Sequence, residues 1–144
     1  MSTYMTYFVT MPILNADFAF SFAHSWIEGW NQRDIDAVLS HYADDFELAS
    51  PLIPSIVGES SGILQGKADV RAYWNKGLAQ IPDLHFELKE VLTGVDSITL
   101  YYRGHRGMVT EVLWFDGTGK VKKAWACYAI DIIRVSNEAI ANFS

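Results

Sequence analysis

The chain has little that would stabilise it covalently or attract a polyanion. Its single cysteine, Cys127, excludes an internal disulfide. Seventeen Asp and Glu residues against eleven Lys and Arg give a net charge of −6 at pH 7. No basic stripe is present that could release counterions from nucleic acid or an anionic membrane. We therefore expect neither nucleic acid nor a membrane as a partner.

The N-terminal residues also lack the pattern of a secretory signal. The apolar stretch from Phe8 to Leu14 is short, contains Pro12 and has no basic flank. We therefore expect a cytoplasmic protein. Residues 1–14 show no clear period, so we predict an N-terminal arm there and a single domain over residues 15–144, as the chain length allows.

Motifs for cofactors and metals are missing as well. No dinucleotide-binding fingerprint occurs, and the Gly-Thr-Gly-Lys sequence at 117–120 lacks the strand-to-helix context of a phosphate loop, which favours a hairpin turn. His41, His85 and His105 lie far apart in the sequence and form no recognisable ligand pair. We predict a site that works without a metal or a cofactor.

Two helices are indicated in the first third of the chain. Phe18, Phe22, Trp26 and Trp30 recur at four-residue steps, which predicts a helix with one aromatic, buried face. Asp34 can cap a second helix. The buried face of that helix would consist of Ile35, Val38, Leu39 and Tyr42.

A strand, a loop and a third helix are predicted next. Residues 46–52 form the strand, and Pro51 and Pro54 prevent its regular continuation. The segment from Ile53 to Leu64 combines glycine and serine with apolar residues, which fits either a mobile pocket lid or a loop folded onto the core. Inward-facing apolar residues from Asp69 to Ile81 predict the third helix.

The second half predicts an antiparallel meander of four strands. Residues 84–88 and 98–102 alternate between apolar and polar, whereas residues 108–115 and 121–130 are apolar on both faces. A sheet covered on one side by helices should be polar on the other. We predict that a second copy of the chain covers the outer patch, and the alternative is a terminal segment such as residues 1–14. The outer patch consists of Val112, Trp114, Trp125 and Cys127.

Residue size supports the assignment of one face of the last strands to a cavity, an assignment that the family resemblance described below decides. Ala124 and Ala126 are small and leave space on a concave wall, and the same face of the preceding strand carries Glu111 between Val109 and Leu113. Removal from water disfavours the ionised form of a carboxyl group, so its pKa rises unless a cation is near. Glu111 could then exchange a proton near neutral pH.

Other placements of Glu111 stay open at this stage. It could pair with Arg71 or Arg103, lie solvated at the cavity mouth, or face outward if the strand register shifts by one residue. His24, two residues before Trp26, is the histidine we consider for the cavity, although such a position is more often a partly exposed helix residue.

The order and spacing of these elements resemble the nuclear transport factor 2-like superfamily, in its SnoaL-like and ketosteroid-isomerase-like branch. The shared marks are Trp-Asn-x-x-Asp-Ile-Asp at 30–36, Tyr-Ala-Asp-Asp-Phe at 42–46 and Gly-Lys-x-x-Val-Arg-x-Tyr at 66–73. The resemblance implies an α+β fold, in which a cone-shaped, curved antiparallel sheet is wrapped by three N-terminal helices. It also implies a small-molecule pocket inside the cone.

Ketosteroid isomerases give the sharpest comparison within that branch. The resemblance places Ser50 where their general base stands, Trp26 where a helix tyrosine stands, and Glu111 where a protonated acid in a late strand stands. Their supporting tyrosines fall on Tyr42 and Trp74. A serine hydroxyl cannot remove a carbon-bound proton unaided, and an indole lacks the acidity of a phenol. We therefore do not expect steroid-type isomerisation by that mechanism.

The sequence thus predicts a cavity for a mainly apolar, cyclic or aromatic small molecule. Glu111 would exchange a proton with a carbonyl or hydroxyl group during isomerisation, cyclisation or dehydration, and the resemblance to SnoaL-like cyclases implies a single acid/base group of this kind. The alternative is a non-catalytic ligand-binding or carrier domain. The expected ligand contacts are Trp26, Tyr42, Ser50, Trp74, Tyr102, Leu113 and Tyr128.

Overall fold

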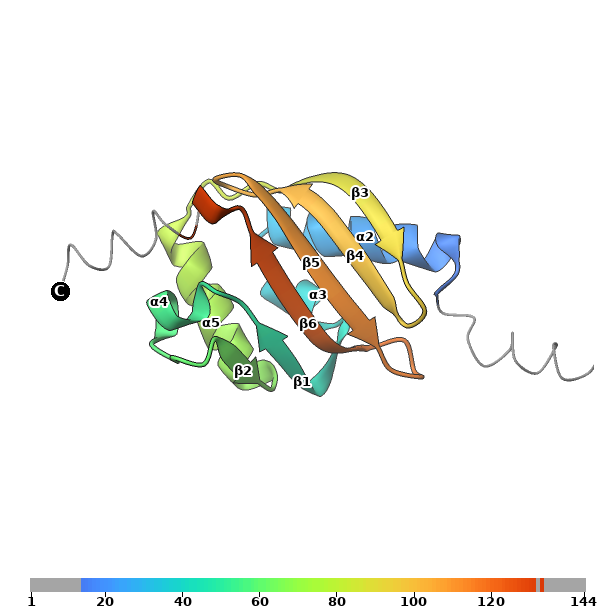
Figure 1. Ribbon diagram of the computed structural model, residues 1–144, viewed down its shortest axis with the longest axis horizontal. Helices are drawn as coiled ribbons and strands as arrows, with labels where there is room; N and C mark the ends of the chain where they lie inside the picture. Colours follow the sequence, from blue (N-terminus) through green and yellow to red (C-terminus); the bar gives the residue numbers. More distant parts are fainter. Residues whose placement is uncertain (1–13, 132, 134–144) are drawn as a thin grey trace, which may run out of the picture.

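The computed structural model describes residues 14–131 and 133, which form a six-stranded sheet with helices packed on one face (Figure 1). The predicted arm lies outside the described residues except for Leu14. In chain order the elements are α2 (Ala16–Asn31), α3 (Ile35–Leu39), β1 (Tyr42–Ala49), α4 (Ile53–Val57), β2 (Ile63–Gln65), α5 (Lys67–Gln80), β3 (Glu87–Thr93), β4 (Ser97–Arg103), β5 (Met108–Phe115) and β6 (Val121–Tyr128).

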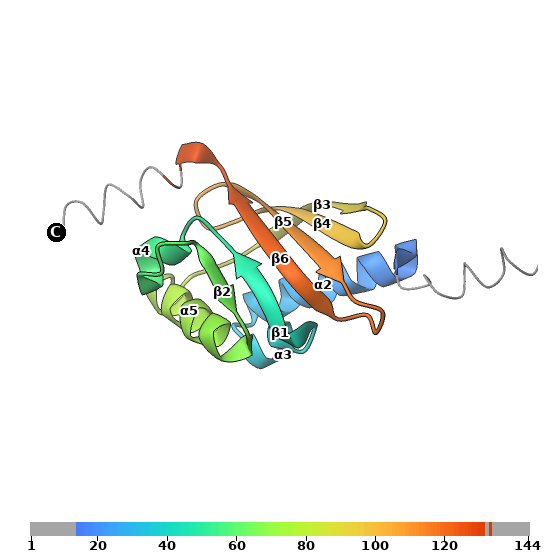
Figure 2. The ribbon, with the colours of Figure 1, turned by 60° about the horizontal axis from the view of Figure 1, so that its bottom comes forward.

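The strand order in the sheet is β2-β1-β6-β5-β4-β3. The last four strands form the predicted antiparallel meander, but β1 joins it by parallel pairing with β6, for example Leu48 beside Ala124. The sheet is therefore mixed, and its edge strands β2 and β3 do not close into a barrel. Figure 2 shows α2, α3 and α5 on the same side of this curved sheet, which we call its inner face. The predicted α+β fold is confirmed.

The first two helices approach each other closely. Asp34 caps α3 as predicted, because its side chain accepts a hydrogen bond from the Ala37 N–H at 3.1 Å. A Cβ atom at Gly29 would lie 2.9 Å from Val38 Cγ2. Only glycine allows α2 and α3 to pack at this distance, which explains a helix-weakening residue in the middle of an aromatic face.

The predicted loop from Ile53 to Leu64 contains regular structure at both ends. It begins with α4, where Pro54 occupies the first turn that tolerates proline, and Gly58 with φ 78° ends the helix in the left-handed region. Ile53 is fully buried. The first half of this segment is thus folded onto the core, which was one of the two interpretations.

Several predicted boundaries were wrong: the strand predicted over residues 46–52 is β1, which spans Tyr42–Ala49. Tyr42 begins β1 and pairs with Val121, instead of closing the second helix. The strand predicted from residue 84 starts only at Glu87, because the backbone of Phe86 is bound by a side chain and not by a neighbouring strand. The Asn31 amide accepts from the Phe86 N–H at 2.7 Å and donates to the Phe86 carbonyl at 3.0 Å.

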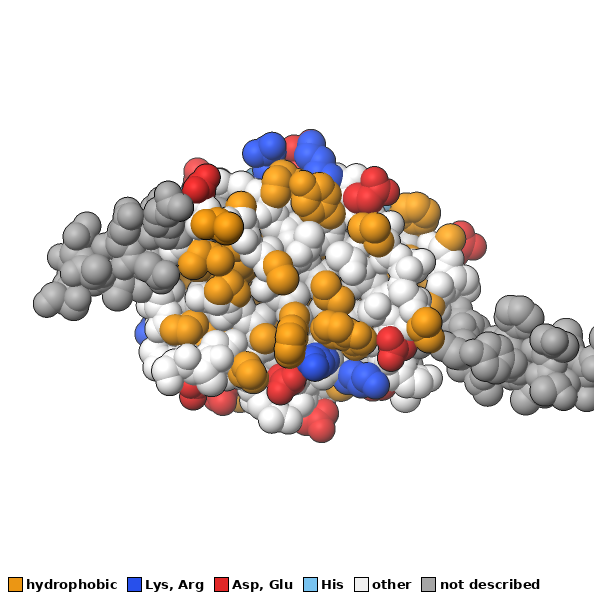
Figure 3. All heavy atoms as spheres, in the orientation of Figure 1, with side chains coloured by type: hydrophobic (Ala, Val, Ile, Leu, Met, Phe, Trp, Pro, Cys, Tyr) orange, Lys and Arg blue, Asp and Glu red, His pale blue; other side chains and the backbone are white. Residues whose placement is uncertain are grey.

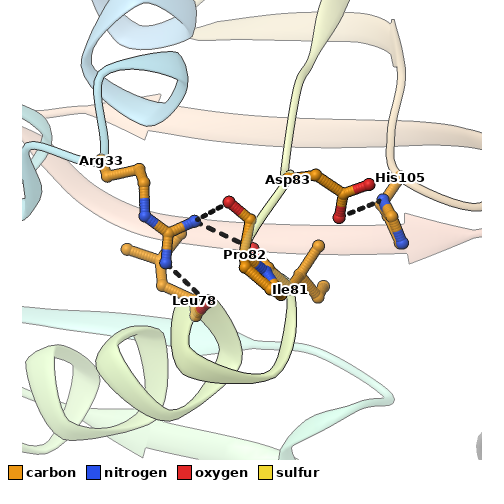
Figure 4. Close-up of polar contacts among 6 residues, drawn as sticks. All are labelled: Arg33, Leu78, Ile81, Pro82, Asp83 and His105. Atoms are coloured by element: carbon orange, nitrogen blue, oxygen red, sulfur yellow. Dashed lines mark hydrogen bonds and ion pairs between the residues drawn. The ribbon is translucent and has the colours of Figure 1, made fainter.

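Arg33 joins the α2–α3 junction to the end of α5 (Figure 4). Its backbone lies in the left-handed region with φ 59°. Its guanidinium donates to the carbonyls of Leu78 at 2.7 Å and Ile81 at 2.8 Å. The last carbonyls of a helix lack internal partners and attract cations. Arg33 therefore fixes the segment that connects α5 to β3.

The outer face of β5 and β6 is apolar, and Figure 3 shows hydrophobic side chains gathered over these strands. The rings of Trp114 and Trp125 meet edge to face at 6.1 Å, and Lys123 Nζ lies 4.4 Å from the Trp125 ring centre. Trp125 is 41% exposed, and Cys127 is exposed beside it. No element of the described residues covers this surface, so its coverage by a second copy stays a prediction.

Loss of the Arg33 contacts should weaken the fold measurably. We expect Arg33→Ala to lower the free energy of unfolding by about 1–2 kcal/mol, because at least two charge-assisted hydrogen bonds at a partly exposed site are removed. Urea denaturation measures this change. Arg103→Ala is the matched control, since the Arg103 side chain is exposed and makes no hydrogen bond within the described residues. Equal losses in the two variants would contradict the role assigned to Arg33.

Candidate active site

A cavity of about 430 Å³ lies between the inner face of the sheet and the helices. Its walls come from α2, α4, α5 and the cavity-facing residues of β1, β4, β5 and β6, and its mouth includes the β4–β5 hairpin. This volume falls in the range of about 300–1,000 Å³ that is typical of small-molecule sites. The cavity is large enough to hold an organic ligand of metabolite size.

Aromatic rings form much of the cavity wall. The Trp30 and Trp74 rings meet edge to face at 4.9 Å, and the Trp26 and Tyr102 rings do so at 5.5 Å. Phe86 stacks on Trp26 at 6.2 Å. Each ring is held by another ring, so the wall offers fixed, flat apolar surfaces. Such surfaces favour planar or cyclic ligands.

Glu111 contributes a buried carboxyl group to this wall. It lies in the middle of β5, paired with Leu100 on one side and Ala126 on the other. Its side chain is only 5% exposed, and no hydrogen bond or ion pair to it occurs within residues 14–131. Burial therefore raises the pKa of Glu111 to about 8. At pH 7 the carboxyl group is mainly protonated and can donate a hydrogen bond.

The alternatives considered for Glu111 do not hold. Arg71 pairs with Asp36 on the surface at 2.7 Å, and Arg103 is exposed and outside the cavity wall. The register of β5 is the one that places Glu111 inward. His24 is exposed on α2 and does not line the cavity.

Three hydroxyl groups form a cluster in the same cavity. Tyr73 donates to Ser50 Oγ at 3.2 Å, and the Leu52 N–H donates to the same oxygen at 3.2 Å. Tyr128 lies close to both hydroxyls, because Ser50 and Tyr73 each affect its pKa. Burial raises the pKa of Tyr73 to about 12 and holds the pKa of Tyr128 well above its usual value. Both phenols therefore remain neutral donors at physiological pH.

The sheet register brings this hydroxyl cluster and Glu111 to one part of the cavity. Glu111 is paired with Ala126, and Tyr128 follows two residues later on the same face of β6. Diagonal neighbours of this kind lie about 7–8 Å apart. When ionised, Glu111 also raises the pKa of Tyr73 and Tyr128, which reflects their proximity. One ligand can contact the carboxyl group and the cluster together.

Most of the predicted contact residues line the cavity, but two do not. The lining includes Trp26, Ser50, Trp74, Tyr102 and Tyr128. Tyr42 lies behind the wall, where its hydroxyl accepts a hydrogen bond from Trp26 Nε1 at 2.9 Å. Leu113 lies further along β5, between Ile98 and Ala124, and all three side chains are fully buried. The expectation that Tyr42 and Leu113 contact ligand is therefore corrected.

Tyr73, His105 and Arg106 were not predicted to be site residues. Tyr73 was expected to face inward, but its spacing on α5 did not reveal the contact with Ser50, 23 residues earlier. His105 was considered only as a metal ligand and Arg106 was given no role, whereas both line the cavity mouth. Both residues directly precede β5, and this position in the sequence could have indicated that they lie at the end of the cavity.

Two searches of the described part of the chain gave negative results. No three His, Cys, Asp or Glu side chains there are grouped so that they could hold a metal ion. No helix there is long and apolar enough to cross a membrane.

Comparison with solved structures identifies close and distant relatives. A SnoaL-like protein of unknown function from Burkholderia thailandensis is 50% identical, with a TM-score of 0.78 over 81% of this chain and 98% of that chain. AclR, a putative hydroxylase from Streptomyces galilaeus, is 17% identical, with a TM-score of 0.63 over 86% of this chain and 98% of that chain. SalBIII, an epoxide hydrolase/cyclase-like enzyme in pyran ring formation in salinomycin, is 15% identical, with a TM-score of 0.62 over 82% of this chain and 95% of that chain.

The two distant structures show a shared fold and nothing more. A comparison with curated protein sequences gives no significant match. The family model described as SnoaL-like domain matches residues 23–143. This match covers all the strands and helices described above except the start of α2, and the chain therefore belongs to the SnoaL-like domain family.

Proposed function

We propose that this chain is a cofactor-independent enzyme that binds a mainly apolar, cyclic or aromatic metabolite and uses Glu111 as its acid/base group. The observation that carries this proposal is the buried carboxyl group of Glu111, which has no ionic partner within the described residues and lies on an aromatic cavity wall. Perturbed carboxyl groups in clefts are typical of functional sites. The putative hydroxylase and the cyclase-like enzyme of the same fold are consistent with ring chemistry in such a cavity.

The protonated carboxyl group supplies the first step of the proposed reaction. Glu111 donates a hydrogen bond, and then its proton, to a carbonyl or hydroxyl oxygen of the ligand. The carboxylate that results is poorly solvated and therefore basic. It recovers a proton from a carbon or hydroxyl group of the same ligand. The proton is conserved, so the scheme fits isomerisation, cyclisation and, with release of water, dehydration.

The hydroxyl cluster supplies orientation in this scheme. Ser50 Oγ already accepts hydrogen bonds from Tyr73 and from the Leu52 N–H, so its own proton is available to Tyr128 or to a ligand oxygen. A second donor beside Glu111 would fix the ligand and stabilise negative charge that develops on oxygen. Ser50 is therefore the second polar partner that we propose, together with the phenols that hold it.

A non-catalytic carrier is the second candidate, and one observation favours it. The phenols of the cavity have raised pKa values, which leaves Glu111 as the group of the inner wall that titrates near neutral pH. A carrier needs only one such group to orient its ligand. Conversion of bound cyclic ketones and hydroxyketones, followed by chromatography, separates the two candidates. If the chain is an enzyme, the wild type converts one of these compounds and the Glu111→Gln variant does so about 10²–10⁴-fold more slowly. If it is a carrier, neither protein converts any of them.

Ligand binding should depend on the protonation of Glu111. The probe is 2-acetylnaphthalene, a planar ketone that does not titrate between pH 6 and 10. Its affinity for the wild type should be constant below pH 8 and fall towards tenfold per pH unit above it, because only the protonated carboxyl donates to the carbonyl. Glu111→Gln, which keeps an amide donor, should bind without this pH dependence. Isothermal titration calorimetry measures the affinity at each pH. The proposal is contradicted if the affinity varies with pH in the same way for the wild type and for Glu111→Gln.

The raised pKa of Glu111 also predicts how stability varies with pH. The folded protein holds a proton on Glu111 up to about pH 8, whereas the unfolded chain releases it near pH 4.5. Between these values the native state binds more protons, so stability falls as pH rises, by up to about 1.4 kcal/mol per unit. Glu111→Gln removes this loss and should gain a few kcal/mol relative to wild type between pH 5 and 8.

Urea denaturation at several pH values measures this difference, and Glu90→Gln is the control because Glu90 is exposed on β3. Parallel stability curves for the wild type and Glu111→Gln would show that the carboxyl group is not held neutral in the folded protein.

We also propose that the outer sheet face pairs with a second copy of the chain. Trp114 and Trp125 form an apolar surface that extends over two central strands, and such patches mark interfaces. We expect a dimer in sedimentation velocity, and a monomer for Trp125→Glu. Phe20→Glu changes an exposed aromatic residue on α2, which packs on the opposite face of the sheet, and should leave the dimer intact. A monomeric wild type would refute this assembly.

A further inference from the structure

We propose that the ligand of this cavity carries an anionic group, such as a carboxylate, and that Arg106 at the cavity mouth binds it. This inference rests on the proposed function, because it concerns the same cavity and adds the charge of the ligand. The opposite end of the ligand would present its carbonyl or hydroxyl oxygen to Glu111. The substrate class is thus a rigid, mainly apolar keto acid or hydroxy acid.

Arg106 lines the cavity, and its side chain has no partner within the described residues. It lies in the hairpin between β4 and β5, which is closed by a 2.7 Å hydrogen bond from the Gly104 N–H to the Gly107 carbonyl. Among the described lysines and arginines, Arg106 alone lines the cavity. It makes no ion pair or hydrogen bond with residues 14–131. In a chain of net charge −6, carboxylates that could have paired with it are plentiful.

The other charged groups at the mouth leave Arg106 free. Asp83, from the segment that connects α5 to β3, faces His105 across the mouth (Figure 4). Its Oδ1 lies 4.0 Å from His105 Nδ1, and its side chain is 82% exposed. Asp83 thus lies against His105 and not against Arg106.

The spacing along the chain limits the length of the ligand. Arg106 lies in the hairpin five residues before Glu111, so their Cα atoms lie at most about 18 Å apart, the span of a fully extended chain. Val109 lies between them on the cavity face, and Tyr102 and Tyr128 flank Val109 in register. The surface between the two polar ends is therefore apolar and aromatic. A ligand that spans it has an apolar ring body with oxygen functions at opposite ends.

A matched pair of rigid probes tests the inference. In 6-acetyl-2-naphthoic acid a ketone and a carboxylate lie at opposite ends of a fused ring, and in 6-acetyl-2-naphthamide the carboxylate is replaced by a neutral amide. We expect the wild type to bind the acid roughly three- to tenfold more tightly at pH 7 and low salt, as a partly exposed charge-assisted contact allows. The preference should shrink in 0.5 M NaCl because salt screens exposed charges.

Two arginine variants assign the preference to a position. Arg106→Gln should bind the two probes equally, whereas Arg103→Gln, an exposed arginine at the end of β4 outside the cavity, should keep the wild-type preference. Both variants change the net charge equally. Equal affinities in the wild type, or a preference that survives Arg106→Gln, would overturn the inference while leaving the proposed function intact. Failure of both probes to bind the wild type would contradict the proposed function itself.

Discussion

The desolvation of one carboxyl group, that of Glu111, is the physical constraint on which the site depends. The central position of β5 removes this group from water, and the surface arginines are engaged elsewhere or too exposed to compensate, as the Arg71–Asp36 pair shows. The neutral form is therefore favoured, and its pKa rises to about 8. The fold thereby keeps a protonated carboxyl group in an apolar cavity, where hydrogen bonds are stronger than in water.

The rest of the fold keeps that cavity open and shaped. Ring-on-ring contacts such as Trp30 with Trp74 hold the aromatic wall in place, and Trp26 is fixed from behind by its hydrogen bond to Tyr42. Arg33 and Asn31 anchor the segment between α5 and β3, which borders the mouth. The Arg33 and Asn31 contacts hold the backbone beside the cavity mouth, so they shape the mouth although neither residue lines the cavity.

The sequence alone predicted the features that follow from the periodic spacing of apolar residues within one helix or strand. The two-residue alternation of β5 left two outcomes for Glu111, and the family resemblance, supported by the small alanines of β6, selected the cavity side. Parity does not tell how deep a residue lies along the strand, which is why Leu113 was expected at the ligand but lies in the core. The contact of Tyr73 with Ser50 and the parallel pairing of β1 with β6 join distant segments, and no local pattern encodes them.

The protonation state of Glu111 is the central claim, and NMR titration of the side-chain carboxyl carbons in protein labelled with ¹³C-glutamate tests it most directly. The account predicts one resonance with a midpoint near pH 8 that is missing from the spectrum of Glu111→Gln. A spectrum in which every glutamate titrates near its ordinary pKa of about 4.3 would contradict it, because Glu111 would then be an ionised group at neutral pH and no proton donor.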